Sequence, residues 1–147
     1  RPFCANGEHM ANSASDYLEG KIIDHIFRTG SFTKPTTLAI ALFTAAPSDS
    51  GGGTEVSTSS TGYARQSLNP LDANWAAPTS GNGVTSNVSA INFGTATASW
   101  GTVTHWAIYD ATSGGNLILW DALSASKTIN SGDSFQIGAN QLTITVS

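Results

Sequence analysis

The sequence has a single cysteine, Cys4, among its 147 residues. One cysteine closes no internal disulfide and supplies no multi-cysteine metal site. Charge is scarce as well, because charged residues make up 11% of the chain, against about a quarter in an average soluble domain. The formal net charge is -4, and no basic cluster is present that would release counterions from a phosphate backbone. We therefore expect no binding of nucleic acid.

Long apolar runs are also missing. The longest, at residues 38–43, falls far short of the ~20 residues that a membrane-spanning helix needs. No segment combines a basic start with an apolar signal core, so we expect no membrane insertion. A hydrophobic content of 39% in 147 residues suits one domain with one core.

The first ten residues show no periodicity. Glu8, His9 and Met10 resemble a cloning-site remnant in front of an initiator methionine. We interpret residues 1–10 as an expression-tag remnant, Cys4 included. Residues 11–147 are then expected to form a single β-sandwich domain with an N-terminal helix at about 15–29.

The helix is predicted from apolar spacing. Between residues 15 and 28 the apolar side chains recur at intervals of four and one and form one stripe; they are Leu18, Ile22, Ile23, Ile26 and Phe27. Ser15 or Asp16 suits the N-cap, with Glu19 three residues after Asp16 as in a capping box. Arg28 suits the negative C-terminal end, and Gly30 can close the helix in a left-handed conformation. We expect the stripe to pack on the β-core.

After Gly30, short apolar runs rich in β-branched residues alternate with Gly, Asn, Ser and Pro, which indicates an all-β fold. Residues 37–44 are apolar on both alternating faces, as in a central strand covered twice, either under the helix or between two sheets. Further strands are predicted at residues 63–68, 88–93, 102–109, 116–123, 134–137 and 142–146. This pattern favours an all-β sandwich, Greek-key or jelly-roll-like, with one N-terminal amphipathic helix.

One tight turn and two long loops connect these strands. The turn at residues 110–116 contains Gly114 and Gly115, which supply the positive φ that a tight hairpin needs. Residues 47–62 and 69–83 are predicted to be long loops. Loops of this length usually bind a ligand or pack on a neighbour.

The sequence contains no nucleophile elbow, phosphate loop, zincin helix or dinucleotide fingerprint. His9 lies in the suspected tag, and His25 is expected at the boundary of the helix stripe, touching backbone or solvent. His105 is expected to be an ordinary packed or cross-strand histidine. Asp110 and Asp121 flank the hairpin, where turn caps are far commoner than a glycosidase pair.

The acidic stretch at residues 49–55 lacks the register of a calcium loop and is expected to be a flexible loop. We therefore assign no catalytic, cofactor-binding or metal-binding residues, and we expect a protein that is not an enzyme and needs no cofactor.

Four tryptophans leave room for a carbohydrate-binding module. Trp106 and Trp120 lie in strands with apolar partners, so core filling is favoured for both. Trp75, in a proline-rich loop, is the one expected to face a partner. A sugar-stacking platform would therefore rest on Trp75 and Trp100.

Whole phrases of the chain resemble a known family. They are Leu18-Glu-Gly-Lys-Ile-Ile-Asp-His25-Ile-Phe-Arg28, Pro35-Thr-Thr-Leu-Ala-Ile-Ala-Leu-Phe-Thr44, Pro47-Ser-Asp, Gly53-Thr-Glu-Val56, Gly62-Tyr-Ala-Arg-Gln66, Thr97-Ala-Ser-Trp-Gly-Thr-Val-Thr-His105, Ile108-Tyr-Asp-Ala111 and Lys127-Thr-Ile-Asn-Ser-Gly-Asp133. In this order, with the closing Leu-Thr-Ile-Thr-Val, they resemble small tailed-bacteriophage virion proteins described as tail-fibre or head-decoration proteins. The resemblance runs from about Asp16 to Ser147 and implies a structural role without catalytic residues.

The hypothesis is a non-enzymatic structural protein located in the bacteriophage virion, as a capsid decoration or a tail or fibre component. Its partners would be other virion proteins and copies of itself, with loops 47–62 and 69–83 in the contact and Trp75 as the buried anchor. The alternative is a carbohydrate-binding or receptor-recognition module that binds a host-surface glycan. A small glycan-processing enzyme is a weaker third option and would need paired acidic groups in a cleft.

Overall fold

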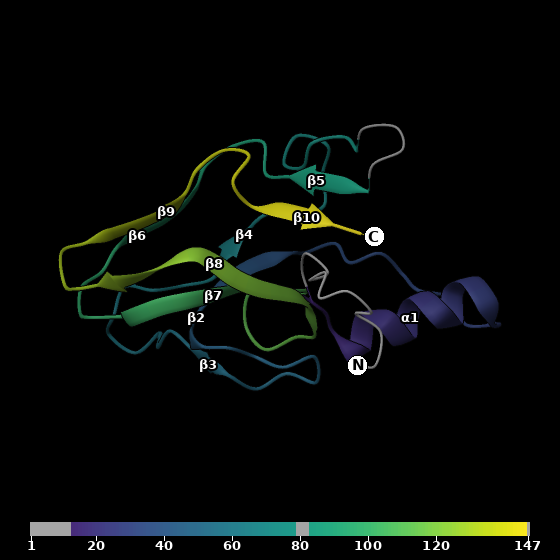
Figure 1. The fold of residues 1–147 in the computed structure, drawn as a ribbon, viewed down its shortest axis with the longest axis horizontal. Coiled ribbons are helices and arrows are strands. Elements are labelled where there is room, and N and C mark those ends of the chain that lie inside the picture. Colours follow the sequence, from purple (N-terminus) through teal and green to yellow (C-terminus); the bar gives the residue numbers. More distant parts are fainter. Residues whose placement is uncertain (1–12, 79–82, 147) are drawn as a thin grey trace, which may run out of the picture.

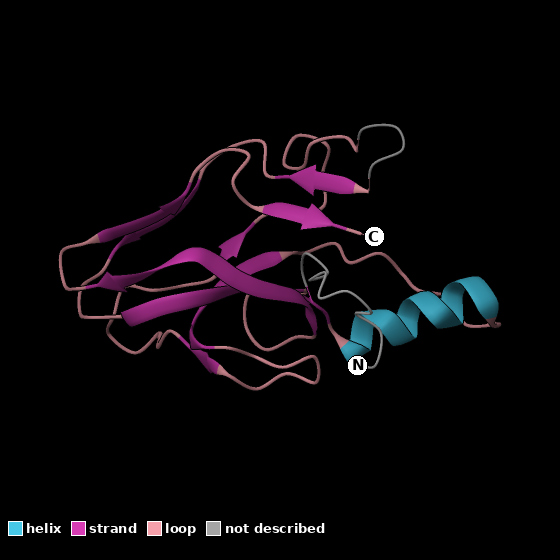
Figure 2. Ribbon diagram, in the orientation of Figure 1, coloured by secondary structure: helices cyan, strands magenta, loops and turns pink. Residues whose placement is uncertain are grey.

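The computed structural model describes residues 13–78 and 83–146. Strands dominate it and one helix lies near the N-terminus (Figure 2), which confirms the predicted all-β class. The segment that we interpreted as a tag, with Cys4, lies outside the described residues. In chain order the elements are β1 (Ser13–Ala14), α1 (Asp16–Phe27), β2 (Ala39–Ala45), β3 (Thr54–Glu55), β4 (Gln66–Ser67), β5 (Val84–Ser86), β6 (Ile91–Thr95), β7 (Gly101–Tyr109), β8 (Leu117–Ile129), β9 (Ser134–Ile137) and β10 (Thr143–Thr145).

The strands form a sandwich-like arrangement of antiparallel sheets. The main sheet has the order β1-β8-β7-β2-β3, and β4 also pairs with β2. Two short sheets, β5 with β10 and β6 with β9, lie across from it (Figure 1). Apolar side chains of both layers share one core cluster, which includes Ile40 and Trp106 from the main sheet and Phe93, Phe135 and Ile144 from the short ones.

Strand β2 is an interior strand of the main sheet, with β7 on one side and the short β3 and β4 on the other. Residues 39–42 have no exposed surface, as predicted for a strand covered on both faces. Ile40 and Leu42 belong to the core between the layers, while Ala41 and Phe43 belong to a smaller cluster on the opposite face. This second face is not covered by the helix. The loop after β2 reaches it instead, where the indole of Trp120 donates to the Asp49 carboxylate at 3.1 Å.

The hairpin between β7 and β8 is as predicted. The Asp110 carboxylate accepts hydrogen bonds from the Asn116 backbone N–H (2.7 Å) and side-chain amide (2.8 Å). Gly114 and Gly115 have φ of 60° and 78°. A Cβ at position 115 would lie 2.6 Å from the Asp110 carboxylate, so the turn requires glycine there both for φ and for space.

Strand boundaries differ from the prediction mainly where burial is weak. β8 continues to Ile129, six residues past the predicted end at 123, and its Lys127, Thr128 and Ile129 pair with the start of β7. The added residues are mostly exposed and polar, so they carry no apolar alternation. Of the predicted strand at residues 63–68, only the short β4 forms. The strands β1, β3 and β5 were not predicted. Strands of two or three residues depend on their pairing partners and carry no pattern of their own.

The helix has the predicted start but not the predicted packing. Ser15 is the N-cap, and its hydroxyl accepts from the Leu18 N–H at 3.1 Å. The helix ends at Phe27, followed by extended Arg28, whose guanidinium pairs with the Asp24 carboxylate at 3.0 Å. Gly30 has no positive φ in the structure and does not close the helix in a left-handed conformation.

The expectation that the helix stripe packs on the β-core is wrong. No residue of α1 is buried, and only Tyr17 and Leu18, in its first turn, pack against the core. The helix is exposed because only the segment before it is attached to the sheet: β1 pairs with β8, and the helix then extends away from the sheets (Figure 1). In the described part of the chain no helix is long and apolar enough to cross a membrane.

Candidate interaction surfaces

The first candidate surface is the apolar face of α1, which we call the helix stripe: Ile22, Ile23, Ile26 and Phe27. These side chains are 41%, 51%, 63% and 74% exposed. At about 3.6 residues per turn they cover one side of the helix, and the charged Asp24 and Arg28 lie on the other. An uncharged stripe of this size in water is a surface that normally becomes covered by a partner.

The second candidate surface is a cleft of about 680 Å³, which we call the apolar groove. It lies between β8 and the sheet of β5 and β10, and its walls include Leu38, Leu71, Trp75, Ile118, Ile144 and Val146. Among the described residues that line it, Asp72 is the one charged side chain. The volume is in the range of ligand pockets, about 300–1,000 Å³, but few polar groups are present to orient a polar ligand.

Trp75 forms part of the groove wall and is held rigidly. Its indole Nε1 donates to the Leu68 carbonyl at 3.1 Å, and its ring packs against the core. Trp75 is therefore partly buried within its own chain, so replacing it would also disturb the fold. The ring therefore contacts its own core as well as lining the groove, where it was expected to face a partner.

The other tryptophans are enclosed to different degrees. Trp100 is 4% exposed, and its Nε1 donates to the Thr61 carbonyl at 2.8 Å, so its ring is not available for the sugar-stacking platform that the carbohydrate-binding alternative would need. Trp106 is 6% exposed and fills the core, as predicted. Trp120 packs against the smaller cluster and against the His105 ring.

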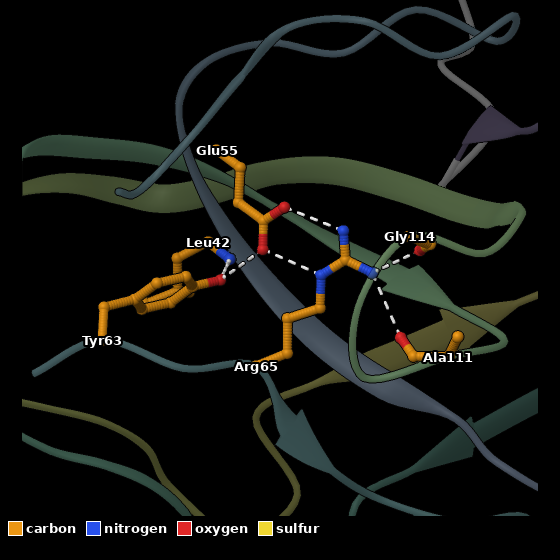
Figure 3. A network of polar contacts seen from close by, with 6 residues as sticks. All are labelled: Leu42, Glu55, Tyr63, Arg65, Ala111 and Gly114. Atoms are coloured by element: carbon orange, nitrogen blue, oxygen red, sulfur yellow. Dashed lines mark hydrogen bonds and ion pairs between the residues drawn. The ribbon is translucent and has the colours of Figure 1, made fainter. Parts of the chain in front are cut away.

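A polar network joins the loop before β4 to the hairpin of β7 and β8 (Figure 3). Arg65 donates from Nε and Nη2 to the two oxygens of Glu55, both at 2.8 Å. Its Nη1 donates to the carbonyls of Ala111 (3.1 Å) and Gly114 (2.8 Å). The side chain of Arg65 is 8% exposed, so this bidentate pair is largely shielded from solvent.

Tyr63 extends the network into the core. Its hydroxyl donates to Glu55 Oε1 and accepts from the Leu42 N–H, both at 2.9 Å. Burial raises the pKa of the Tyr63 phenol far above its usual 10.0, and the negative charge of Glu55 raises this pKa further, against the lowering effect of the Leu42 N–H. Tyr63 is therefore a neutral structural group.

The ion pair between Arg65 and Glu55 also favours the charged form of Arg65. Burial would lower the pKa of Arg65, but the hydrogen bond and charge of Glu55 outweigh it, so the pKa is raised. Sequence reasoning missed this network, since it assigned Glu55 to a flexible loop, whereas Glu55 lies in β3. A pair ten residues apart has no periodic signal by which it could have been found.

The structure keeps the two hairpin aspartates apart. Asp110 caps the turn, as predicted, but Asp121 lies inside β8 opposite Trp106, not at a strand end. Asp110 is four residues beyond Trp106, the partner of Asp121 in the sheet. At ~3.3 Å per residue, the backbone positions of Asp110 and Asp121 are therefore separated by roughly 13 Å along the strand direction. The carboxylates of a glycosidase pair are about 5–9.5 Å apart.

The two histidines in the described residues contact backbone, a threonine hydroxyl and an aromatic ring. His25 accepts from the Phe32 N–H at 3.1 Å on the exposed side of the helix, a contact with backbone as predicted. His105 lies within β7, hydrogen-bonded to Thr104 at 2.8 Å and packed on Trp120, as expected for a packed strand histidine. Residues 13–78 and 83–146 bring together no group of three or more potential metal ligands.

Comparison with protein families identifies the family to which this chain belongs. A family model described as podophage GP4 fiber I protein gp80 matches residues 13–145. The chain belongs to this family. As a gp80-family fibre protein it is a component of the phage virion, which confirms both the resemblance to phage virion proteins and the predicted location. No curated protein matches the chain.

The match includes α1 and the strands on both sides of the apolar groove. The helix stripe, the groove and the Arg65 network are thus all features of the gp80-like part of the chain. None of them resembles a built catalytic centre.

Proposed function

We propose that the chain is a non-enzymatic structural subunit of a phage tail fibre, which binds copies of itself and other virion proteins. The observation that carries this proposal is the match to a phage fibre family across residues 13–145. A head-decoration role would call for a different position in the particle, and the family description names a fibre.

The distribution of polar groups supports a role without catalysis. In the part of the chain that the structure describes, no buried side-chain nitrogen or oxygen is left without a hydrogen-bond partner. The most elaborate polar cluster, around Arg65, is satisfied by Glu55 and backbone carbonyls. Buried polar groups that await a substrate are normally incompletely paired, so these groups support a structural role.

Self-association is supported by exposed apolar surface. The helix stripe and the apolar groove have no covering partner within the described chain, and fibre proteins act in assemblies. The carbohydrate-binding alternative loses support, because Trp100 is enclosed and the groove around Trp75 offers few hydrogen-bonding groups for sugar hydroxyls.

The decisive experiment is to locate the protein on intact phage particles by cryo-electron microscopy, with Fab fragments raised against the isolated chain. We expect Fab density on the tail fibres. Density on the capsid shell would contradict the fibre assignment and favour head decoration.

A parallel screen tests the non-enzymatic part of the proposal. Purified protein should release no products from a panel of bacterial polysaccharides and esters. Turnover that is lost in His105→Ala or Asp121→Asn, with the fold retained by circular dichroism, would overturn this part.

A further inference from the structure

Exposed large apolar side chains are concentrated on two surfaces of this protein. Within the described residues, seven large hydrophobic side chains are exposed: Ile22, Ile23, Ile26, Phe27, Leu71, Val88 and Val146. The first four form the helix stripe, and Leu71 and Val146 line the apolar groove. Only Val88 lies on neither, so nearly all of the apolar surface in need of cover belongs to one convex and one concave element.

We propose that α1 of one copy inserts the helix stripe into the apolar groove of a second copy. This inference rests on the proposed function, because a fibre subunit works among copies of itself. An amphipathic helix with anchors on adjacent turns is a common occupant of a hydrophobic groove. Ile22 and Ile26, and likewise Ile23 and Phe27, are spaced four residues apart, which provides two neighbouring rows of anchors.

The same strand anchors the helix and lines the groove. The Ser15 N–H donates to the Ile118 carbonyl at 3.0 Å, and Ala14 pairs with Leu119. Ile118 and Leu119 are also groove residues. The helix of each copy therefore starts beside its own groove and then extends away from it (Figure 1), so its stripe does not reach the groove of its own chain.

This placement favours a reciprocal exchange between two copies. When a helix departs next to the groove that it matches, a second copy related by a two-fold axis can receive that helix and return its own. Both apolar surfaces of both copies are then covered by one kind of contact. A foreign partner would have to provide both a convex and a concave apolar surface to achieve the same result.

The charge pattern fits this contact as well. Lys21, Asp24 and Arg28 lie on the side of the helix opposite the stripe, and Arg28 pairs with Asp24 at 3.0 Å. Insertion would leave these three charges in water, whereas Glu19, four residues before Ile23, lies on the side of the stripe at its N-terminal end, where it would have to stay at the rim of the groove. The groove has a single charged lining residue in the described chain, Asp72, so the inserted side chains meet an apolar wall.

Complementation between two variants tests the exchange. Ile26→Asp disables the helix stripe, and Leu71→Asp disables the groove; both positions are exposed, so the subunit should still fold. In sedimentation-velocity experiments each variant alone should be monomeric at concentrations where the wild type associates. An equimolar mixture should regain association, at least tenfold tighter than either variant alone, because it contains one intact helix and one intact groove.

Val88→Asp is the matched control, since Val88 is an exposed apolar residue (43%) on neither surface. It should associate as the wild type does. If Ile26→Asp or Leu71→Asp associates normally, or if the mixture is no better than its components, the exchange is wrong. A wild-type chain that stays monomeric at all concentrations, although found on tail fibres, overturns this inference and leaves the proposed function intact.

Cross-linking distinguishes exchange between copies from insertion within one copy. Ile26→Cys and Leu71→Cys are placed on separate chains in a Cys4→Ser background, mixed and oxidised. A covalent dimer on a non-reducing gel is the expected result. With both cysteines in one dilute chain, efficient formation of an intrachain disulfide and no dimer would overturn the proposal.

Discussion

The guanidinium carbon of Arg65 lies 3.8 Å from the centre of the Tyr109 ring. This stacking places a positive charge against the face of an aromatic ring that is itself partly buried. The same guanidinium holds Glu55 of β3 and two carbonyls of the β7–β8 hairpin. One side chain thus ties together three segments that are distant in the sequence, on the side of the main sheet where β2 and β3 pair.

Removal of Arg65 should therefore destabilise the subunit. We expect Arg65→Ala to lower the free energy of unfolding by about 3 kcal/mol, because the two carbonyls lose their donor and Glu55 loses its ionic partner and keeps only the Tyr63 hydroxyl. Arg65→Lys should still lose at least ~1 kcal/mol, since an ammonium cannot make the bidentate contact or stack in the same way. Urea unfolding measures both.

Arg28→Ala provides the control for this prediction. Arg28 and Asp24 form an exposed pair, with side chains 71% and 51% accessible, so this change should cost under ~0.5 kcal/mol. Equal effects of Arg65→Ala and Arg28→Ala would show that the network contributes nothing special to stability.

Stability should fall in strong alkali. Burial raises the pKa of Tyr63, and also that of Tyr109, in the folded state above the usual 10.0. A raised folded-state pKa means that the unfolded chain loses these protons first, so the stabilising contribution is complete below pH 10 and declines as the pH rises above it. Chemical unfolding between pH 8 and 11 should show this decline, and Tyr63→Phe should flatten it. An unchanged slope in Tyr63→Phe would contradict this explanation.

The two isoleucines Ile26 and Ile40 should respond differently to the same truncation. Ile26 is exposed on α1, so Ile26→Ala should change the stability of the monomer by under ~0.5 kcal/mol. Ile40 is fully buried in β2, and Ile40→Ala should cost about 2–5 kcal/mol. Unfolding is measured at dilutions where light scattering shows monomers. A large loss for Ile26→Ala under those conditions would mean that the helix packs on its own subunit.

Glycine-to-alanine substitutions should have opposite signs at two positions. Gly115→Ala should destabilise by more than ~1 kcal/mol, because Gly115 has a positive φ and a Cβ there would collide with Asp110. Gly20 lies within α1 with open space around it, so Gly20→Ala should stabilise the helix by roughly 0.5–1 kcal/mol. Thermal melting of the two variants gives the comparison, and a neutral Gly115→Ala would show that the hairpin tolerates another turn.

Local chemistry made several features of this fold predictable. Residues 39–43 are apolar on both faces, and a run of that kind needs two covered faces wherever it lies, so a buried central strand followed directly. Ser15 could be recognised as one of two candidate caps, beside Asp16, and Gly114-Gly115 as a hairpin turn, because each depends on contacts within about six residues. The phage virion family was likewise recognisable from short phrases in a fixed order.

Long-range contacts determined the remaining features. The apolar spacing of Ile22 and Ile26 predicts that this side of α1 seeks cover, but not whether the cover comes from the same chain; the pairing of Ala14 with Leu119 directs the helix away from its own core. Likewise, Glu55 and Arg65 meet only because β3 and the segment before β4 both lie beside β2. Periodicity records which residues share a face of one element, whereas the neighbour of that face depends on how distant segments pair in space.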